Sequence, residues 1–280
     1  MQTDLFDVVI IGGGIVGTAT GMALANRHNI KVAVIESEKS LAAHQTGHNS
    51  GVIHSGLYYK PNSLKAINCV EGRTKLYNFC RENSIKVEQC GKLVVVSNES
   101  EIPRLNELEN RGKLNGLKGL RRLSEKELKE YEPHVTGIGG LFVPETGIVD
   151  YSEVTNKFAQ KIEENGGKIL LGCRFLGLKK KSNLSINTSI GEIQSIYLVN
   201  CAGLYSDRVA KLCNIKPTLK IIPFRGEYYK LIKGKEGLVK NLIYPVPDPK
   251  FPFLGVHFTR MINGGCEAGP NAVLAFKREG

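Results

Sequence analysis

The chain has 280 residues, of which 41% are apolar and 23% charged, which suits a globular protein with a sizeable core. It contains no apolar run near the ~18 residues of a membrane-spanning helix, and its first residues lack the basic charge of a secretory signal, so we expect a cytoplasmic protein. The net charge of +11 favours an anionic cofactor, substrate or membrane surface over nucleic acid, because the basic runs are short and lack interleaved aromatic residues. Seven cysteines without a CxxC pair favour reduced thiols over disulfides or zinc.

The first elements along the chain predict a βαβ unit. Residues 6–11 form a short apolar run rich in β-branched side chains, and a cluster of glycines follows. Residues 15–27 have helical spacing, and residues 31–35 predict a second buried strand that ends at Glu36. A strand, a glycine turn, a helix and a strand in this order are typical of a parallel strand pair.

The rest of the chain predicts alternating α/β and mixed segments. Helical spacing occurs at residues 63–83, 101–115, 124–131 and 151–165. Strands are expected at residues 91–97, 168–179, 184–188, 194–200, 220–231 and 242–258. Ser124 and Glu127 have the spacing of a capping box at the start of the third helix. Residues 139–150 predict a glycine-rich turn region, and GPNAV at 269–273 predicts a tight turn.

These segments predict an α/β protein with two discontinuous domains. Residues 1–85 and 145–219 are expected to form a Rossmann-like nucleotide-binding domain. Residues 86–144 and 220–280 are expected to form an α+β substrate domain with a mixed or antiparallel sheet.

The segment GGGIVG at residues 12–17 fits the dinucleotide fingerprint G-x-G-x-x-G. Its glycines allow a tight turn, close approach of a pyrophosphate and close packing of the helix on the strand. An acidic residue at the end of the second strand would accept hydrogen bonds from ribose hydroxyls and repel a 2′-phosphate, so FAD and NAD remain and NADP is disfavoured. A glycine turn without a ligand is the alternative. The nucleotide-binding candidates are Gly12, Gly14, Ile15, Val16, Gly17, Glu36 and Ser37.

Several segments together resemble the D-amino-acid-oxidase-type FAD-dependent oxidoreductases, and within them the L-2-hydroxyglutarate oxidases and dehydrogenases. The segments are GGGIVGTATGMALA, VIES, QTGHNSGVIHSGLYY, NCAGLYSD, PFRGEYY, YPVPDPKFPFLGVHFTR and GPNAVLAFKREG. The resemblance runs from Asp7 to Gly280. Proteins of that family continue beyond this point, so we expect the C-terminal return to the FAD domain to be absent from this sequence.

The resemblance implies FAD as the cofactor and a segment after Glu36 that runs along its pyrophosphate and flavin ring. The residues it implies as flavin contacts are Thr46, Gly47, His48, Asn49, Ser50 and Gly51. It further implies backbone contacts near the adenine end from Phe175, Ala202 and Gly203. For Ala202 and Gly203, an ordinary strand-to-helix turn is the alternative.

His54 is the leading candidate for a catalytic base. Oxidation of an alcohol removes a proton from the hydroxyl as hydride leaves the carbon, and histidine titrates near neutrality. The alternative is that His54 only packs or hydrogen-bonds near the cofactor. His44 and His48 lie four residues apart, but a glycine-rich loop does not hold them on one helical face, so no metal site is expected.

A dicarboxylate substrate needs fixed cations and hydroxyl donors. The resemblance favours pocket roles for Arg225 and His257, which we count with His54 as catalytic candidates. The full set of substrate candidates is Tyr59, Arg225, Tyr244, His257 and Arg260. Surface charge is the alternative for each arginine and for Lys277 and Arg278, and a buried core histidine is the alternative for His257.

The expected function is FAD-dependent oxidation of L-2-hydroxyglutarate to 2-oxoglutarate, with electrons passed to oxygen or to a membrane quinone. The basic charge would suit peripheral contact with the cytoplasmic membrane face. The alternatives are another oxidoreductase of the same fold, such as a glycine or sarcosine oxidase or a glycerol-3-phosphate dehydrogenase, a non-catalytic flavin-binding fragment, and an NAD-dependent dehydrogenase.

Overall fold

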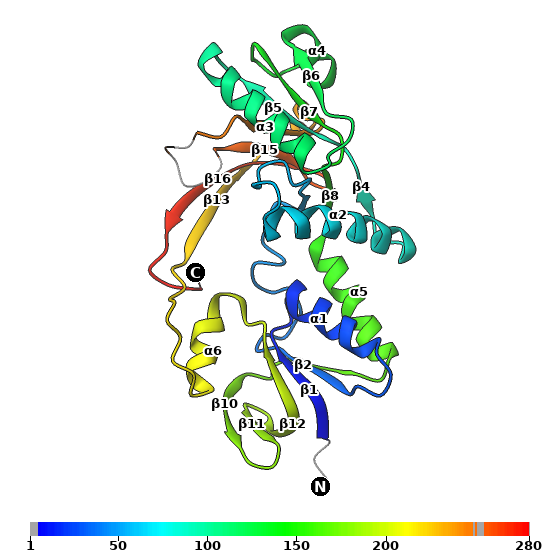
Figure 1. The fold of residues 1–280 in the computed structure, drawn as a ribbon, viewed down its shortest axis with the longest axis vertical. Coiled ribbons are helices and arrows are strands. Elements are labelled where there is room, and N and C mark those ends of the chain that lie inside the picture. Colours follow the sequence, from blue (N-terminus) through cyan, green and yellow to red (C-terminus); the bar gives the residue numbers. More distant parts are fainter. Residues whose placement is uncertain (1–4, 249, 251–254, 280) are drawn as a thin grey trace. The chain divides into compact units, whose positions relative to one another are not determined.

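The computed structural model describes residues 5–248, 250 and 255–279, which form two compact units (Figure 1). Unit 1 consists of the described residues of Met1–Asn49, Tyr151–Pro223 and Ala275–Gly280. Unit 2 consists of those of Ser50–Asp150 and Phe224–Leu274. Each unit has its own sheets and helices, and the predicted α/β class is confirmed.

These units differ from the predicted domains mainly at residues 50–85. The sequence-based division places this segment with the nucleotide-binding domain, whereas the structure places it in unit 2. Side-chain contacts explain the difference, because Arg73 donates hydrogen bonds to the Ser55 carbonyl and to Glu145, both of unit 2. The strand that ends at Val149 pairs with residues 52–53 and 87–88, so the residues before Tyr151 also belong to unit 2.

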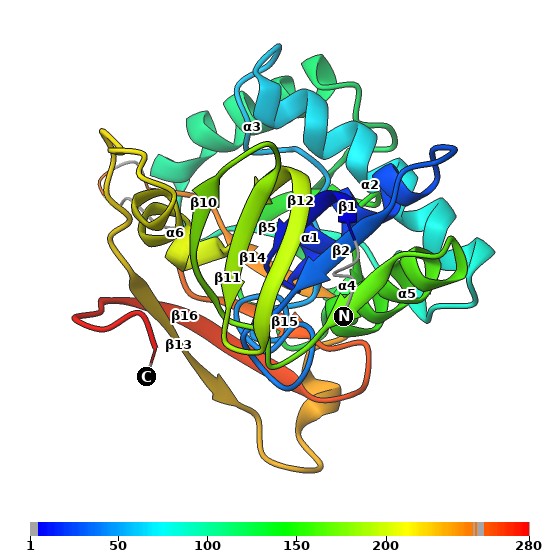
Figure 2. The ribbon, with the colours of Figure 1, turned by 90° about the horizontal axis from the view of Figure 1, so that it is seen from below.

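Unit 1 is built on a six-stranded sheet with the order β10-β11-β12-β1-β2-β9 (Figure 2). Strands β12, β1, β2 and β9 are parallel to one another, whereas β11 pairs antiparallel with both β10 and β12. The strands are β1 Leu5–Ile11, β2 Val32–Ile35, β9 Lys168–Leu170, β10 Phe175–Lys180, β11 Leu184–Thr188 and β12 Gly191–Asn200. The helices are α1 Ile15–Ala25, α5 Tyr151–Glu164, the 3-10 turn η2 Gly203–Tyr205 and α6 Ser206–Leu212.

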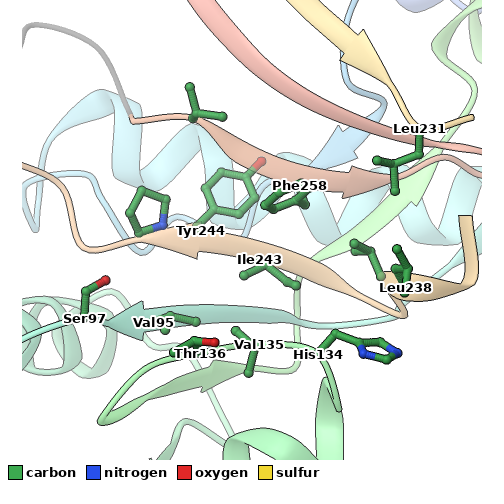
Figure 3. Close-up of a pocket in the computed structure, with 13 residues that line it drawn as sticks. Val95, Ser97, His134, Val135, Thr136, Leu231, Leu238, Ile243, Tyr244 and Phe258 are labelled. Atoms are coloured by element: carbon green, nitrogen blue, oxygen red, sulfur yellow. The ribbon is translucent and has the colours of Figure 1, made fainter. Parts of the chain in front are cut away.

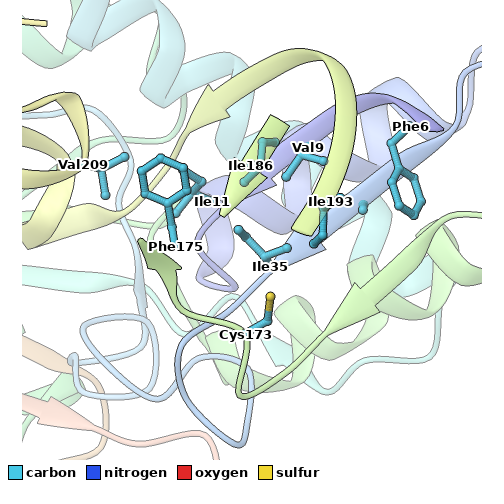
Figure 4. Close-up of a cluster of buried hydrophobic side chains, with 10 residues drawn as sticks. Phe6, Val9, Ile11, Ile35, Cys173, Phe175, Ile186, Ile193 and Val209 are labelled. Carbon is cyan, nitrogen blue, oxygen red and sulfur yellow. The ribbon is translucent and has the colours of Figure 1, made fainter. Parts of the chain in front are cut away.

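Alternation of side chains along β1 supplies a core on each face of this sheet. Val8 and Ile10 pack with residues of α1 and α5, where Gly21 brings the two helices close together. Val9 and Ile11 point to the other face and pack with Phe175 of β10 and Val209 of α6, among others (Figure 4). The predicted βαβ unit is confirmed in β1, α1 and β2, with the parallel pairing expected.

Unit 2 contains a seven-stranded sheet, β13-β16-β15-β14-β5-β7-β6, and a three-stranded sheet, β3-β8-β4. The strands of the larger sheet are β5 Lys92–Val96, β6 Arg121–Ser124, β7 Gly139–Val143, β13 Phe224–Lys230, β14 Leu242–Pro245, β15 His257–Arg260 and β16 Cys266–Leu274. The smaller sheet has β3 Val52–Ile53, β4 Val87–Glu88 and β8 Gly147–Val149. The helices are α2 Leu64–Glu82, η1 Glu99–Glu101, α3 Ile102–Leu114, α4 Glu125–Tyr131 and η3 Glu236–Leu238.

The central strand β5 is buried throughout and contributes to two cores. Val94 and Val96 pack under helix α3, while Leu93 and Val95 pack with Leu128 of helix α4 on the opposite face. Side chains alternate between the two faces of a strand, so Lys92 points to the same face of β5 as Val94 and Val96. This is the face that α3 covers. Lys92 is thus a charged side chain on a buried face of the sheet, and the candidate site in unit 2 lies around it.

Most predicted elements are confirmed, including helix α4 with its capping box between Ser124 and Glu127. Two turn predictions were wrong, and the predicted strand 168–179 is divided into β9 and β10. The expected turn region 139–150 contains β7 and β8, because Gly140 permits close backbone packing: a Cβ there would lie 2.6 Å from the Val94 carbonyl oxygen. The expected tight turn at 269–273 lies inside β16, where an irregular register with β13 accommodates it.

The predicted strand 242–258 is divided into β14 and β15, and residues 249 and 251–254 lie outside the described residues. No helix in the described part of the chain has the length and apolar character needed to cross a membrane.

Candidate functional site

The glycines at the carboxyl end of β1 pack the start of unit 1 tightly. Gly12 has φ +114°, and a Cβ there would lie 2.3 Å from the Cys201 carbonyl oxygen. A Cβ on Gly17 would lie 1.9 Å from the Gly12 carbonyl oxygen. Both positions therefore require glycine, one for the turn and one for packing of α1 on the strand.

Gly14 has a different environment, because an added Cβ would meet only the Thr46 hydroxyl, at 3.1 Å. It is the N-cap of α1 and provides no side-chain cap, and the first turn contains no acidic residue. The Ile15 N–H donates to Thr46 Oγ1 at 3.0 Å, while the N–H groups of Gly14 and Val16 have no partner among the described residues. Free N–H groups beside open space at a helix N-terminus suit a phosphate anion.

Glu36 at the end of β2 shapes the same edge of the sheet. Its carboxylate accepts hydrogen bonds from the Gly13 N–H at 2.6 Å, the Glu38 N–H at 2.9 Å and the Ser37 hydroxyl at 3.1 Å. An ionised carboxylate has about four lone-pair sites, so capacity remains for a ribose hydroxyl. The residues of unit 1 therefore fit the adenosine and pyrophosphate part of a dinucleotide.

The structure holds the predicted flavin-contacting segment in a turn. His48 Nδ1 lies 2.9 Å from the His44 carbonyl oxygen, and the Asn49 side-chain amide donates to the Thr46 carbonyl at 2.6 Å. Thr46, His48 and Asn49 belong to unit 1, and Ser50 and Gly51 to unit 2. Their flavin contacts stay a prediction.

Gly51 has a structural reason to be glycine, since its φ is +66° and an added Cβ would lie 2.7 Å from the Val149 carbonyl oxygen. Phe175 buries its side chain in the core of unit 1 (Figure 4), which leaves only its backbone for the predicted adenine contact. Ala202 and Gly203 form the turn before α6, and Gly203 has φ +52°. Packing requirements thus account for several residues that the resemblance assigns to FAD.

A matched pair of glycine variants separates binding from folding. We expect Gly17→Ala to lower the free energy of unfolding by about 1–3 kcal/mol, since backbone must move. Gly14→Ala should leave the unfolding free energy nearly unchanged but weaken FAD binding at least about tenfold, because its Cβ enters the space beside the free N–H groups. Urea denaturation and FAD titration of the apoprotein measure the two effects. Equal FAD affinity in Gly14→Ala would contradict a phosphate site at this helix.

Unit 2 holds His54 at the start of a tightly anchored loop. Cys69 Sγ of α2 lies 3.3 Å from the His54 carbonyl oxygen, and Arg73 donates to the Ser55 carbonyl at 2.9 Å. From α3, Arg111 donates to the Tyr58 carbonyl and Asn115 to the Tyr59 carbonyl, both at 2.9 Å. Two helices thereby fix residues 54–59, which would otherwise be an irregular loop.

Lys92 lies in a cage of aromatic side chains near this loop. Its Nζ is 4.3 Å from the centre of the Tyr58 ring and 4.9 Å from that of Tyr244. Tyr244 in turn stacks on His257, with ring centres 4.0 Å apart and an interplanar angle of 12°. Lys92 was missed by sequence reasoning, because it precedes an apolar run and no polar–apolar alternation in β5 marks it.

Burial favours the neutral form of both histidines of this cluster. The pKa of His54 is lowered to about 4 by burial and by the nearby Lys92 and His257. Burial and Lys92 also lower the pKa of His257, against an opposing hydrogen bond to the Gly255 carbonyl at 3.1 Å. Since that carbonyl can only accept, His257 Nδ1 carries the proton and Nε2 of the neutral ring has a free lone pair.

The structure does not bring the predicted arginines into this cluster. Arg225 is exposed on β13 and pairs with Glu227 at 2.6 Å, and Arg260 pairs with Glu88. Tyr59 is partly buried. Burial is the larger cause that raises the pKa of its hydroxyl, and the nearby Cys69 is the smaller one. Arg278 pairs with Asp207 of unit 1 and its side chain is 12% exposed, so it is not the solvated surface charge named as its alternative. Substrate contacts of Arg225, Arg260 and Tyr59 therefore stay predictions.

A cavity of about 370 Å³ lies among the strands of unit 2 (Figure 3). Its walls are mainly apolar and include Val95, Ile243 and Phe258, and none of its lining residues is a lysine, arginine, aspartate or glutamate. The side chains of Val95 and Lys92 point to opposite faces of β5. This cavity lacks the cations that a dicarboxylate needs, so the Lys92 cluster is the better candidate for substrate binding.

Comparison with known proteins agrees with these features. The model of the FAD dependent oxidoreductase family matches residues 7–279. The L-2-hydroxyglutarate dehydrogenase of Indibacter alkaliphilus is 58% identical over 98% of this chain and 70% of its own length. The human mitochondrial L-2-hydroxyglutarate dehydrogenase is 50% identical, and the chain spans 63% of its length.

Among solved structures, the dithionite-reduced L-alpha-glycerophosphate oxidase of Mycoplasma pneumoniae, with FAD bound, has a TM-score of 0.87 at 25% identity. The alignment covers 99% of this chain and 73% of that one. The fold, the dinucleotide edge of unit 1 and the family match confirm the family resemblance predicted from the sequence. The chain belongs to the FAD dependent oxidoreductase family.

Proposed function

We propose that this chain carries the FAD-binding and substrate-binding parts of an enzyme that oxidises L-2-hydroxyglutarate to 2-oxoglutarate. The observation that carries the proposal is the buried, neutral His54 beside Lys92 and His257 in a chain 58% identical to a protein named L-2-hydroxyglutarate dehydrogenase. A neutral base near a lysine suits the oxidation of an anionic alcohol, because the base can take the hydroxyl proton and the cation attracts a carboxylate.

FAD, when bound, supplies the acceptor for the hydride that leaves the substrate carbon. His54 accepts the hydroxyl proton, so the C–O bond becomes a carbonyl as the C–H electron pair departs. The substrate hydroxyl has a single proton, so His257, whose Nε2 also has a lone pair, is the alternative acceptor of that proton rather than a second one. On unit 1, Gly14 and Val16 would hold the pyrophosphate through their N–H groups, and Glu36 the ribose.

A substrate panel tests this proposal against other activities of the fold. We expect L-2-hydroxyglutarate to have a kcat/KM at least about 100-fold above those of D-2-hydroxyglutarate, glycine, sarcosine and glycerol 3-phosphate, because the buried polar groups remain unpaired with the wrong substrate. Initial rates with an artificial electron acceptor measure all five compounds under one condition. A higher kcat/KM for an amino acid or for glycerol 3-phosphate would overturn the proposed substrate.

The proposal includes oxygen or a membrane quinone as the electron acceptor and a cytoplasmic protein at the membrane face. The excess of basic residues, with a net charge of +11, supports attraction to an anionic surface. Rates with oxygen and with a soluble quinone analogue distinguish the acceptors. Absence of sedimentation with anionic vesicles at low salt would contradict the membrane contact.

A further inference from the structure

We propose that Lys92 and Tyr58 form a preformed binding site for one carboxylate of the substrate. The inference deepens the proposed function and rests on it for the identity of the dicarboxylate. Neither residue was among the candidates from the sequence. Each would act as a specificity-determining group, Lys92 through its charge and Tyr58 through its hydroxyl.

The first observation is the absence of a counter-ion at Lys92. Its side chain is 1% exposed, yet it has no ion pair or hydrogen bond among the described residues. The other buried charged side chains differ in this respect. Arg73 pairs with Glu145, and Glu132 accepts hydrogen bonds from the backbone of Lys240 and Asn241. Of the buried charged side chains that the structure describes, Lys92 alone has no group to neutralise it, which leaves that role to a ligand.

The second observation is an unsatisfied donor beside it. The Tyr58 hydroxyl is buried and has no hydrogen-bond partner among the described residues. The Tyr58 ring already contacts Lys92, so one carboxylate can bind near the ammonium group and accept the phenolic O–H. Buried polar groups are normally satisfied, so an unsatisfied hydroxyl on the ring that contacts an unpaired ammonium group indicates a missing ligand.

Physical chemistry argues against a purely structural role. Ring faces attract a cation, but they replace only part of the hydration that a buried ammonium group loses. The consequence is visible in the Lys92 pKa, which burial lowers to about 7. A bound carboxylate would raise this pKa again, so ligand binding and Lys92 protonation are coupled.

Two variants and a control test the proposal with the FAD-loaded protein. The probe is glutarate, a dicarboxylate without a hydroxyl to oxidise, and its Kd is measured by calorimetry. We expect Lys92→Met and Tyr58→Phe to weaken glutarate binding at least about tenfold while the Tm without ligand stays equal or rises, because each removes an unsatisfied buried group. The control, Lys75→Met, changes an exposed lysine of α2 and should alter neither value.

A lower Tm for Lys92→Met together with an unchanged Kd would overturn the proposal and make Lys92 a structural cation in an aromatic cage. Tyr58→Phe still tests the proposal if Lys92→Met fails to fold, because this variant keeps the aromatic ring of residue 58 and removes only its hydroxyl. An unchanged Kd in Tyr58→Phe would remove the hydroxyl from the site.

The pH dependence of glutarate binding supplies a further readout. The titratable groups that act on Lys92 or face it are His54, Cys69, His257 and the two tyrosines Tyr58 and Tyr244. If the protonated amine binds the carboxylate, Kd should rise about tenfold per pH unit above about 7 and become flat in Lys92→Met. A rise that persists unchanged in Lys92→Met would assign the coupling to another group and contradict the proposal.

These outcomes separate the site from the reaction. Reduction of the flavin by L-2-hydroxyglutarate with glutarate binding insensitive to Lys92 would overturn the carboxylate site and leave the proposed function. Glutarate binding that depends on Lys92, with no reduction by L-2-hydroxyglutarate, would overturn the proposed function and leave the site.

Discussion

Replacing His54 with glutamine should lower kcat by roughly 10²- to 10⁴-fold while FAD stays bound, because the variant loses the group that accepts the substrate proton. Glutamine keeps a polar side chain of similar size, so the anchored loop should keep its conformation. Stopped-flow flavin reduction measures the chemical step directly, and the flavin absorbance confirms the cofactor content. His134→Gln, at the mainly apolar cavity lined by Val95, is the control and should stay within about twofold of wild type.

The pH profile of His54 sharpens this result. Since its pKa is lowered to about 4, His54 should be unprotonated at neutral pH, and kcat/KM should fall on the acid side only as the pH approaches about 4. A folded-state pKa below the ordinary value of 6.5 means that protonation opposes folding, so His54 removes stability as the pH falls from about 6.5 towards 4. The glutamine variant should lose this acid sensitivity. Near wild-type reduction rates across this range would rule out His54 as the base.

Replacing Arg73 with methionine should lower the free energy of unfolding by about 3 kcal/mol, because it leaves a half-buried carboxylate and a carbonyl without their partner. Arg73 joins Glu145 to the Ser55 carbonyl and so holds the loop that begins at His54. Loss of this link should also lower kcat, since the base is less well positioned. Urea denaturation at pH 7 measures the stability change.

Two comparisons make the Arg73 result specific. The double variant Arg73→Met/Glu145→Gln should recover part of the lost stability, because the unpaired carboxylate is gone. Lys129→Met breaks an exposed pair with Glu125 and should cost less than about 1 kcal/mol. A similarly small cost for Arg73→Met would show that the pair does not anchor the loop.

Local sequence patterns were sufficient for the part of unit 1 that binds a nucleotide. In β1, α1 and β2, a buried strand, a glycine turn and an acid at a strand end all indicate one structure. The same patterns failed at β7 and β16, because glycine can mark a turn or a close approach of two strands, and only the tertiary partner distinguishes them.

The site in unit 2 was only partly accessible from the sequence. His54 stands in an unusual loop and is a candidate from the sequence, whereas Lys92 precedes a run of valines and resembles an ordinary strand end. Arg225 has the right chemistry but is exposed and paired with Glu227. Charge can be read from the sequence, but burial and the lack of a counter-ion depend on which strands pair.

The most direct measurement is the absorbance spectrum of the purified, FAD-loaded protein before and after anaerobic addition of L-2-hydroxyglutarate. Bleaching of the flavin bands, with one 2-oxoglutarate formed per flavin, is the expected result and joins cofactor, substrate and hydride transfer in one observation. Flavin bands that persist with this substrate but bleach with an amino acid or with glycerol 3-phosphate would contradict the proposed function.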